Sequence, residues 1–154
     1  MNKDINKNEI RVIVDDFNAN RPFNRALGLV IKSPDFESSF MTFHIKDEFV
    51  GNPIYGNLHG GVISSVLDVA GGHAACLSAV KNIKEPIREK IMEKIAKVNT
   101  IDIRVDYLRP GIGNFFEVKG RLLRAGSKVA VARMELFNDE NSLIAVGTGS
   151  YLIG

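Results

Sequence analysis

The stretch NLHGGVISSVLDVAGGHAACLSAV, residues 57–80, decides the fold because it encodes one long apolar helix. The pattern predicts a helix over residues 62–80 with apolar side chains on nearly every face, and Asp68 is its only charged residue. Such a helix must be covered on most sides, so we expect it at the centre of the protein. Gly71 and Gly72 each destabilise a helix by about 1 kcal/mol relative to alanine. We therefore expect another backbone to approach closely there.

Apolar and polar residues alternate on both sides of this helix, as they do in strands with one buried face. Two such segments precede the helix, at residues 27–31 and 40–46, and four follow it, at residues 101–107, 116–122, 129–137 and 143–153. Turn-forming residues separate the last four, which is typical of consecutive antiparallel strands. The sequence predicts an α+β fold with a six-stranded antiparallel sheet wrapped around one long central helix. The open sheet edges favour self-association.

Two helical segments flank this unit within one domain of residues 1–154. Residues 1–26 form an N-terminal segment with a short amphipathic helix over residues 9–17. Residues 81–99 form a charged insertion whose helix has Pro86 in its first turn and one docked face. That face carries isoleucines at a spacing of four residues, Ile87, Ile91 and Ile95.

Composition excludes several classes of protein. The chain has 154 residues and a formal net charge of only +2, which lacks the basic field of a dedicated nucleic-acid binder. A single cysteine, Cys76, excludes an internal disulfide and fits a reducing compartment, so we expect a cytoplasmic protein. Residues 60–80 match a membrane's thickness but contain Asp68 and His73, which favours a buried helix over a membrane span.

The sequence His59-Gly60-Gly61 opens the central helix and is the first candidate site. The first amides of a helix have no internal acceptor, and the helix dipole adds positive potential. Glycines let a ligand carbonyl approach these amides, which suits an oxygen that gains negative charge during acyl transfer. His59 could orient the glycine amides through a hydrogen bond. The alternative is that the glycines only make a tight turn into the helix.

Asp68 is the second candidate because no basic residue lies one helical turn from it. An unpaired buried carboxylate is unfavourable, so Asp68 should face a pocket, a partner subunit or water. There it could act as a general base or a nucleophile. The alternative is a structural carboxylate that accepts backbone hydrogen bonds across an interface.

A metal site is not expected, because His73 and Cys76 have no further ligands at zinc-like spacing. We expect His73 in the core or at an interface. The chain also lacks Gly-x-Ser-x-Gly, a P-loop and a dinucleotide fingerprint, so no cofactor is predicted.

These motifs resemble the hotdog-fold acyl-CoA thioesterases of the PaaI type. The resemblance rests on residues 58–61 (LHGG), on Asp68 nine positions after His59, and on residues 100–111 (TIDIRVDYLRPG). It covers residues 27–154 and is similar to the YigI-type branch, which is associated with medium- and long-chain acyl-CoA. It therefore implies hydrolysis of acyl-CoA to a free acid and coenzyme A.

The resemblance also implies roles for residues. The Gly60 amide would polarise the thioester carbonyl, and Asp68 would be nucleophile or general base. Thr100 would position the attacking water, and Asn52 is the counterpart of an Asn or Gln before the histidine. Strict alternation points Thr100 away from the helix, so the strand must be bulged there. Family members form the site between two subunits, so a homodimer or a dimer of dimers is expected.

The substrate would be held by Gly61 and, at its phosphates, by surface residues: Arg109, Arg124, Ser127 and Lys128. Two alternatives stay open. A hotdog hydratase or dehydratase would act on acyl thioesters through a different histidine motif. A non-catalytic acyl-CoA sensor would use the same pocket, although no DNA-binding module is visible.

Overall fold

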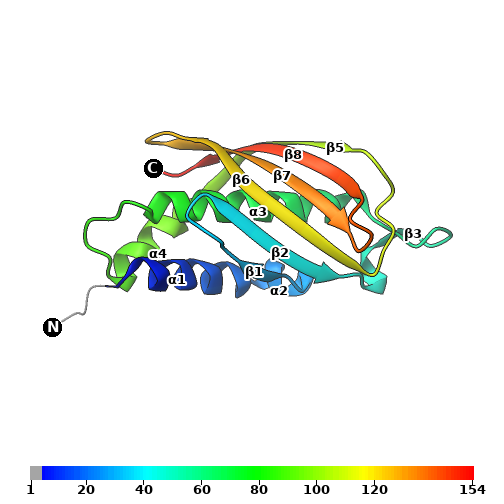
Figure 1. The fold of residues 1–154 in the computed structure, drawn as a ribbon, viewed down its shortest axis with the longest axis horizontal. Coiled ribbons are helices and arrows are strands. Elements are labelled where there is room, and N and C mark those ends of the chain that lie inside the picture. The colour runs from blue at the N-terminus through cyan, green and yellow to red at the C-terminus, as the bar shows by residue number, and fades with distance from the viewer. Residues whose placement is uncertain (1–4) are drawn as a thin grey trace.

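A long central helix and a six-stranded antiparallel sheet build the protein, and the computed structural model describes residues 5–154. The chain begins with helices α1 (Lys7–Ala19) and α2 (Pro22–Leu27) and strands β1 (Val30–Lys32) and β2 (Ser38–His44) (Figure 1). A 3-10 turn (Asp47–Phe49) and the hairpin β3 (Val50–Asn52) and β4 (Asn57–Leu58) lead into α3 (Gly60–Val80). Then follow α4 (Arg88–Ala96), β5 (Asn99–Tyr107), β6 (Phe115–Ala125), β7 (Val129–Asn138) and β8 (Leu143–Leu152).

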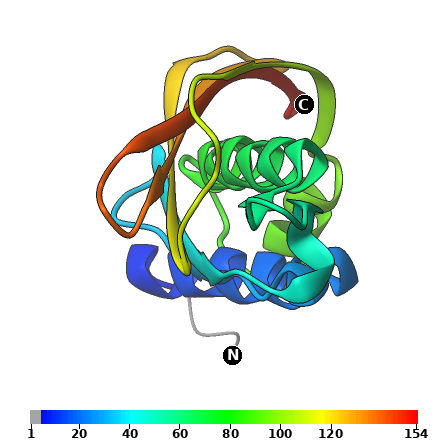
Figure 2. The ribbon, with the colours of Figure 1, turned by 90° about the vertical axis from the view of Figure 1, so that its right-hand side faces the viewer.

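The sheet has the strand order β1-β2-β6-β7-β8-β5, with every neighbouring pair antiparallel. Figure 2 shows it curling over α3 while α1 and α2 lie on the other side of that helix. The predicted architecture, two strands before the helix and four after it, is confirmed. The hairpin of β3 and β4 is an addition that the sequence pattern did not predict.

Alternation along the strands creates the core. In β7 the inward side chains of Ala130, Ala132, Met134 and Leu136 are fully buried. On β2 and β6 the rings of Phe43 and Phe116 stack with centroids 5.2 Å apart. Burial of this apolar surface against α3 is the main force that fixes the sheet around the helix.

The first predicted strand was placed too early. Residues 22–27 are helix α2, which begins at Pro22, a residue suited to the first helical turn. Gly28 ends the helix in the left-handed conformation, at φ 69°, and the strand starts only at Val30. Helix α1 is longer than predicted because Asn6 and Glu9 form a capping box at its start.

The charged insertion contains a helix that docks on α3 through Ile91 and Ile95, which are fully buried. Pro86 was expected in the first turn of this helix, and that position was wrong. Ile87 is the N-cap, so Pro86 lies outside the helix. The N-cap Ile87 is extended, at φ −103° and ψ 152°, and Pro86 is tolerated before it because no helical N–H is needed there.

A side chain, and not a backbone, approaches the glycine pair of α3. A Cβ on Gly71 would overlap the phenol of Tyr151, which reaches across from β8. Gly72 has more room, since its Cβ would lie 3.6 Å from the same ring. The glycine at position 71 therefore makes space for a buried tyrosine that packs between helix and sheet.

Helix α3 is held on its other side by α1. The ring of His73 is fully buried, as expected, and its Nε2 lies 2.8 Å from Asp15 Oδ1 on α1. By length and composition α3 could cross a membrane, but 56% of its most apolar window is buried inside the protein. The core helix of a soluble domain gives the same signal.

Candidate active site

The start of α3 presents one free backbone donor. His59 is the N-cap, and its Nδ1 accepts a hydrogen bond from the Gly61 amide at 2.9 Å. The expected hydrogen bond between His59 and a glycine amide is therefore present, but it engages the Gly61 amide, which was predicted to bind substrate. Among residues 5–154 the Gly60 amide finds no hydrogen-bond acceptor. It is the donor left for a ligand oxygen at the positive end of the helix.

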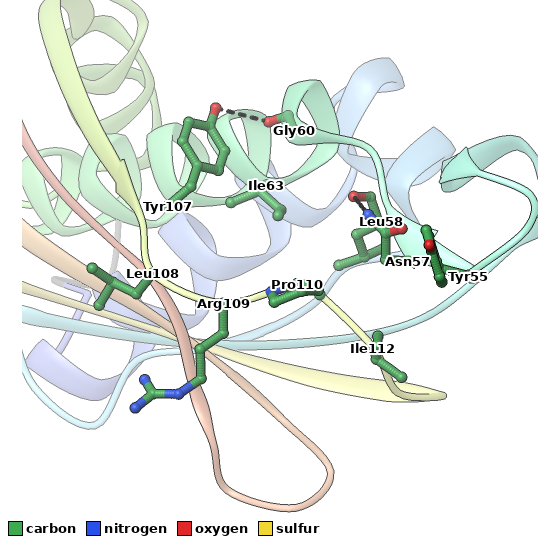
Figure 3. A pocket seen from close by; sticks show the side chains of 11 residues that line it. Tyr55, Asn57, Leu58, Gly60, Ile63, Tyr107, Leu108, Arg109, Pro110 and Ile112 are labelled. Atoms are coloured by element: carbon green, nitrogen blue, oxygen red, sulfur yellow. Dashed lines mark hydrogen bonds between the residues drawn. The ribbon is translucent and has the colours of Figure 1, made fainter.

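Gly60 lines a cavity of about 570 Å³ at the end of the sheet (Figure 3). The ring of Tyr107, at the end of β5, stands over Gly60, and its hydroxyl donates to the Gly60 carbonyl at 3.1 Å. This bond ties the first turn of α3 to β5. Alternation placed Tyr107 on the inward face, and the structure leaves it 54% exposed at the cavity.

Asp68 lies two turns further along α3, half-buried, and its Oδ1 accepts a hydrogen bond from the Thr100 hydroxyl at 2.9 Å. Thr100 reaches it because β5 is bulged. Thr100 pairs with Tyr151 and Asp102 pairs with Ser150, so Ile101 is the extra residue between them. The bulge that the resemblance required is thus present.

A second cavity, of about 250 Å³, contains Asp68 and Thr100. Its walls come from α3, β5 and β8 and from the corner between α1 and α2. The α1–α2 corner contributes Asn18, Arg21, Phe23 and Asn24. Sequence reasoning gave this corner no part in the site, since only the fold brings it next to Asp68.

Tyr151 forms the floor beneath Asp68. Its hydroxyl donates to the main-chain oxygen of Asp68 at 3.3 Å. Burial and then the nearby Asp68 carboxylate raise the pKa of Tyr151 well above its usual value. Its phenol therefore stays protonated and remains a hydrogen-bond donor across the working pH range.

Gly60 and Asp68 line two different cavities of one protomer. Asp68 lies eight positions after Gly60 on the helix, a rise of about 12 Å along the axis. One thioester group could not touch both, so the two halves of the predicted site are apart within a single chain.

The other predicted site residues are scattered. Asn52 Oδ1 accepts from the Ile54 amide at 3.0 Å, which engages it in its own turn. Arg109 lines the cavity beside Gly60, and its guanidinium donates to the Leu143 carbonyl at 2.8 Å. Arg124, Ser127 and Lys128 lie at the β6–β7 turn, at the other end of the strands, where Ser127 lines a separate cavity. The protomer does not gather these residues into one phosphate site.

Metal-ligating side chains do not cluster within residues 5–154, where no group of three or more His, Cys, Asp and Glu could hold an ion. His73 is occupied by Asp15, as described above. Cys76 is buried, and burial raises the pKa of its thiol to about 11. Neither residue is arranged as a ligand or a nucleophile.

Comparison with known proteins identifies the family. A family model described as the thioesterase superfamily matches residues 55–145. The chain belongs to the thioesterase superfamily. This thioesterase-superfamily chain is 42% identical to proteins of Escherichia coli K12 and Salmonella typhimurium named medium/long-chain acyl-CoA thioesterase YigI, over 94% of each chain.

Solved structures of the superfamily share the hotdog fold of this chain. A crystal structure of a thioesterase-related protein from Shewanella oneidensis is 40% identical, with a TM-score of 0.89 over 96% of this chain and 97% of that one. The PaaI protein of Escherichia coli is only 17% identical but has a TM-score of 0.73 over 94% of this chain and 96% of its own, a likeness of fold. The predicted family and fold are confirmed.

Proposed function

We propose that this protein hydrolyses medium- and long-chain acyl-CoA thioesters to a free fatty acid and coenzyme A. The free Gly60 amide, at the start of an apolar helix, is the single observation that carries this proposal. Curated relatives with 42% identity bear the name of this activity. We place the enzyme in the cytoplasm, since its one free cysteine suits a reducing compartment.

The chemistry follows from two groups. The Gly60 N–H donates a hydrogen bond to the thioester oxygen and stabilises its growing negative charge, and one such donor is commonly worth about 3 kcal/mol in the transition state. Asp68 acts on the other side of the carbonyl, as a general base that takes a proton from water or as a nucleophile. With Asp68 as the base, the water oxygen bonds to the acyl carbon, the carbon–sulfur bond breaks, and the coenzyme A thiolate leaves and takes up the proton that Asp68 removed. With Asp68 as the nucleophile, a carboxylate oxygen bonds to the acyl carbon as the thiolate leaves, and water then hydrolyses the mixed anhydride to the free acid. The Thr100 hydroxyl donates a hydrogen bond to one carboxylate oxygen of Asp68, Oδ1.

The two groups meet when two copies pair through β5. This strand is an edge of the sheet, with β8 on one side only (Figure 2). Its first residues lie beside Asp68, and its last residue, Tyr107, lies beside Gly60. Antiparallel pairing about a two-fold axis sets the start of one β5 against the end of the other. Gly60 then faces Asp68 of the partner subunit, and the homodimer holds two equivalent sites.

A hydrolysis screen tests this function. The purified protein is incubated with acyl-CoAs from acetyl to hexadecanoyl and with an aromatic acyl-CoA, and the released thiol is measured. We expect thiol release with medium and long chains. Hydration of an enoyl-CoA without thiol release would instead identify a hydratase, and tight binding without any turnover would identify a sensor.

A further inference from the structure

The cavity beside Gly60 is lined mainly by apolar side chains. It is bounded by Tyr55, Leu58, Ile63, Leu108, Pro110 and Ile112. Several of these are large and yet exposed, with Tyr55 71% and Ile112 53% accessible. Exposed apolar side chains that gather around a concave surface commonly mark a site for an apolar ligand.

Two of the polar side chains in this cavity already have partners in the protein. The Asn57 amide donates to the Leu58 carbonyl at 3.2 Å, and the Arg109 guanidinium donates to the Leu143 carbonyl at 2.8 Å. The pantetheine arm of coenzyme A carries amides and a hydroxyl that need partners, since unpaired polar groups are costly to bury. An alkyl chain needs none.

The cavity beside Asp68 is more polar. Asp68 and Arg21 place two charged groups in its lining, and the side chains of Asn18, Asn24, Ser65 and Thr100, which are bonded within the protein, add further polar atoms. Its volume of about 250 Å³ is less than half of the 570 Å³ beside Gly60. A long alkyl chain is therefore better accommodated on the Gly60 side.

The walls of the Gly60 cavity are fixed before any ligand binds. The Leu58 amide donates to the Gly111 carbonyl at 2.9 Å, which joins β4 to the loop after β5. Asn138 donates to the Ile112 carbonyl at 2.9 Å and holds the far part of that loop. A preformed pocket orders fewer groups on binding and so gains affinity.

We infer that this cavity is the acyl-chain subsite, and that Ile112 and Tyr55 set the length of chain it accepts. The inference rests on the proposed function. A carbonyl oxygen bound by the Gly60 amide places the first carbon of the chain at the mouth of the cavity. Figure 3 shows Ile112 and Tyr55 on the side away from the bond between Tyr107 and Gly60, where a longer chain would end. The assignment leaves Arg109 to fix a loop and not to bind phosphate.

The experiment compares Ile112→Trp with Leu123→Trp. Leu123 is a matched control because it is 51% exposed on β6, outside this cavity. For Ile112→Trp we expect the ratio of kcat/KM for hexadecanoyl-CoA over octanoyl-CoA to fall at least about tenfold, since each methylene left in water weakens binding about fourfold. Leu123→Trp should keep the wild-type ratio. An unchanged ratio in Ile112→Trp would overturn the inference. An equal loss of kcat/KM at every chain length would also overturn it, and would assign the cavity to the pantetheine arm.

Binding of dodecyl-CoA, a thioether that cannot be hydrolysed, separates this inference from the proposed function. The subsite predicts that Ile112→Trp weakens its binding at least about tenfold while Leu123→Trp does not. If no acyl-CoA is hydrolysed but this difference is found, the proposed hydrolysis fails and the subsite stands. If hydrolysis is found and both variants bind dodecyl-CoA like the wild type, the subsite fails alone.

Discussion

The Thr100 hydroxyl donates a hydrogen bond to Asp68 Oδ1 at 2.9 Å, across the start of β5 and the middle of α3. One extra residue in β5 makes this possible, because the bulge at Ile101 turns Thr100 toward the helix. The bond fixes the direction of a carboxylate that has no cationic partner on its own helix. In the proposed mechanism it leaves Oδ2 as the oxygen that faces water or substrate.

Removing this hydroxyl should slow turnover. Thr100→Val keeps the shape of the side chain, and we expect kcat to fall about tenfold, the equivalent of about 1.4 kcal/mol. Thr100→Ser is the matched control and should retain most activity. Steady-state kinetics with one medium-chain acyl-CoA measures both variants. Equal activity in Thr100→Val and wild type would remove the hydroxyl from the mechanism.

Replacing the carboxylate should have a larger effect. Asp68→Asn keeps the size of the side chain and should lower kcat by a factor on the order of 100 or more while KM changes little. Size-exclusion chromatography should show the same oligomer as for the wild type. Near-normal turnover in this variant would exclude Asp68 as base or nucleophile.

Mixing two inactive variants tests whether the site spans two subunits. Gly60→Pro removes the free amide, and proline is tolerated at the first position of a helix. When Gly60→Pro and Asp68→Asn chains are unfolded and refolded together, each mixed dimer regains one intact site. We expect about one quarter of wild-type activity from a statistical mixture of dimers. If both groups of one chain act together, every mixture stays inactive.

The two neighbouring glycines of α3 should respond in opposite ways to alanine. Gly71→Ala places a Cβ where the Tyr151 phenol lies, so we expect a loss of about 1–3 kcal/mol in the free energy of unfolding. Gly72→Ala meets the same ring only at 3.6 Å and gains helix propensity, so it should stabilise by up to about 1 kcal/mol. Urea denaturation at one fixed protein concentration measures both. A neutral Gly71→Ala would contradict the packing of Tyr151 described above.

Cys76 should make stability decrease in alkaline solution. Burial raises the pKa of its thiol from 9.0 to about 11, so the native state holds the proton more tightly than the unfolded state. This contribution to the free energy of unfolding is full below pH 9 and is lost as the pH rises through 11, on the order of 3 kcal/mol in all. Cys76→Ala should flatten the dependence of the urea midpoint on pH across this window. If the urea midpoints of the variant and the wild type fall in parallel with rising pH, other groups cause the loss of stability in alkaline solution.

Much of the fold was predictable because each strand repeats one simple signal. Alternation in residues 40–46 and 129–137 placed Met41 and Met134 in the core, and both are fully buried. The predicted start of the first strand was wrong because apolar residues such as Leu27 and Leu29 fit a strand as well as they fit the end of a short helix. Gly28, with its positive φ, was the signal for a helix end.

The site was predictable where local sequence determines it and not where distant segments meet. His59 caps α3 within three residues, and Asp68 follows on the same helix, so spacing alone pointed to both. Tyr107 contacts Gly60, and Tyr151 contacts Asp68, only because the sheet folds over α3. The α1–α2 corner lies beside Asp68 only because these helices pack against α3. No spacing in the sequence encodes those contacts.

The unpaired edge of β5 has a consequence for how the enzyme behaves in the test tube and in the cell. If each active site takes its two reacting groups from separate chains, the specific activity should fall when dilution favours dissociation of the dimer. Saturating ligand would oppose that drop, because a bound thioester bridges both chains. A rise in substrate concentration would therefore shift subunits into the dimer that hydrolyses the substrate.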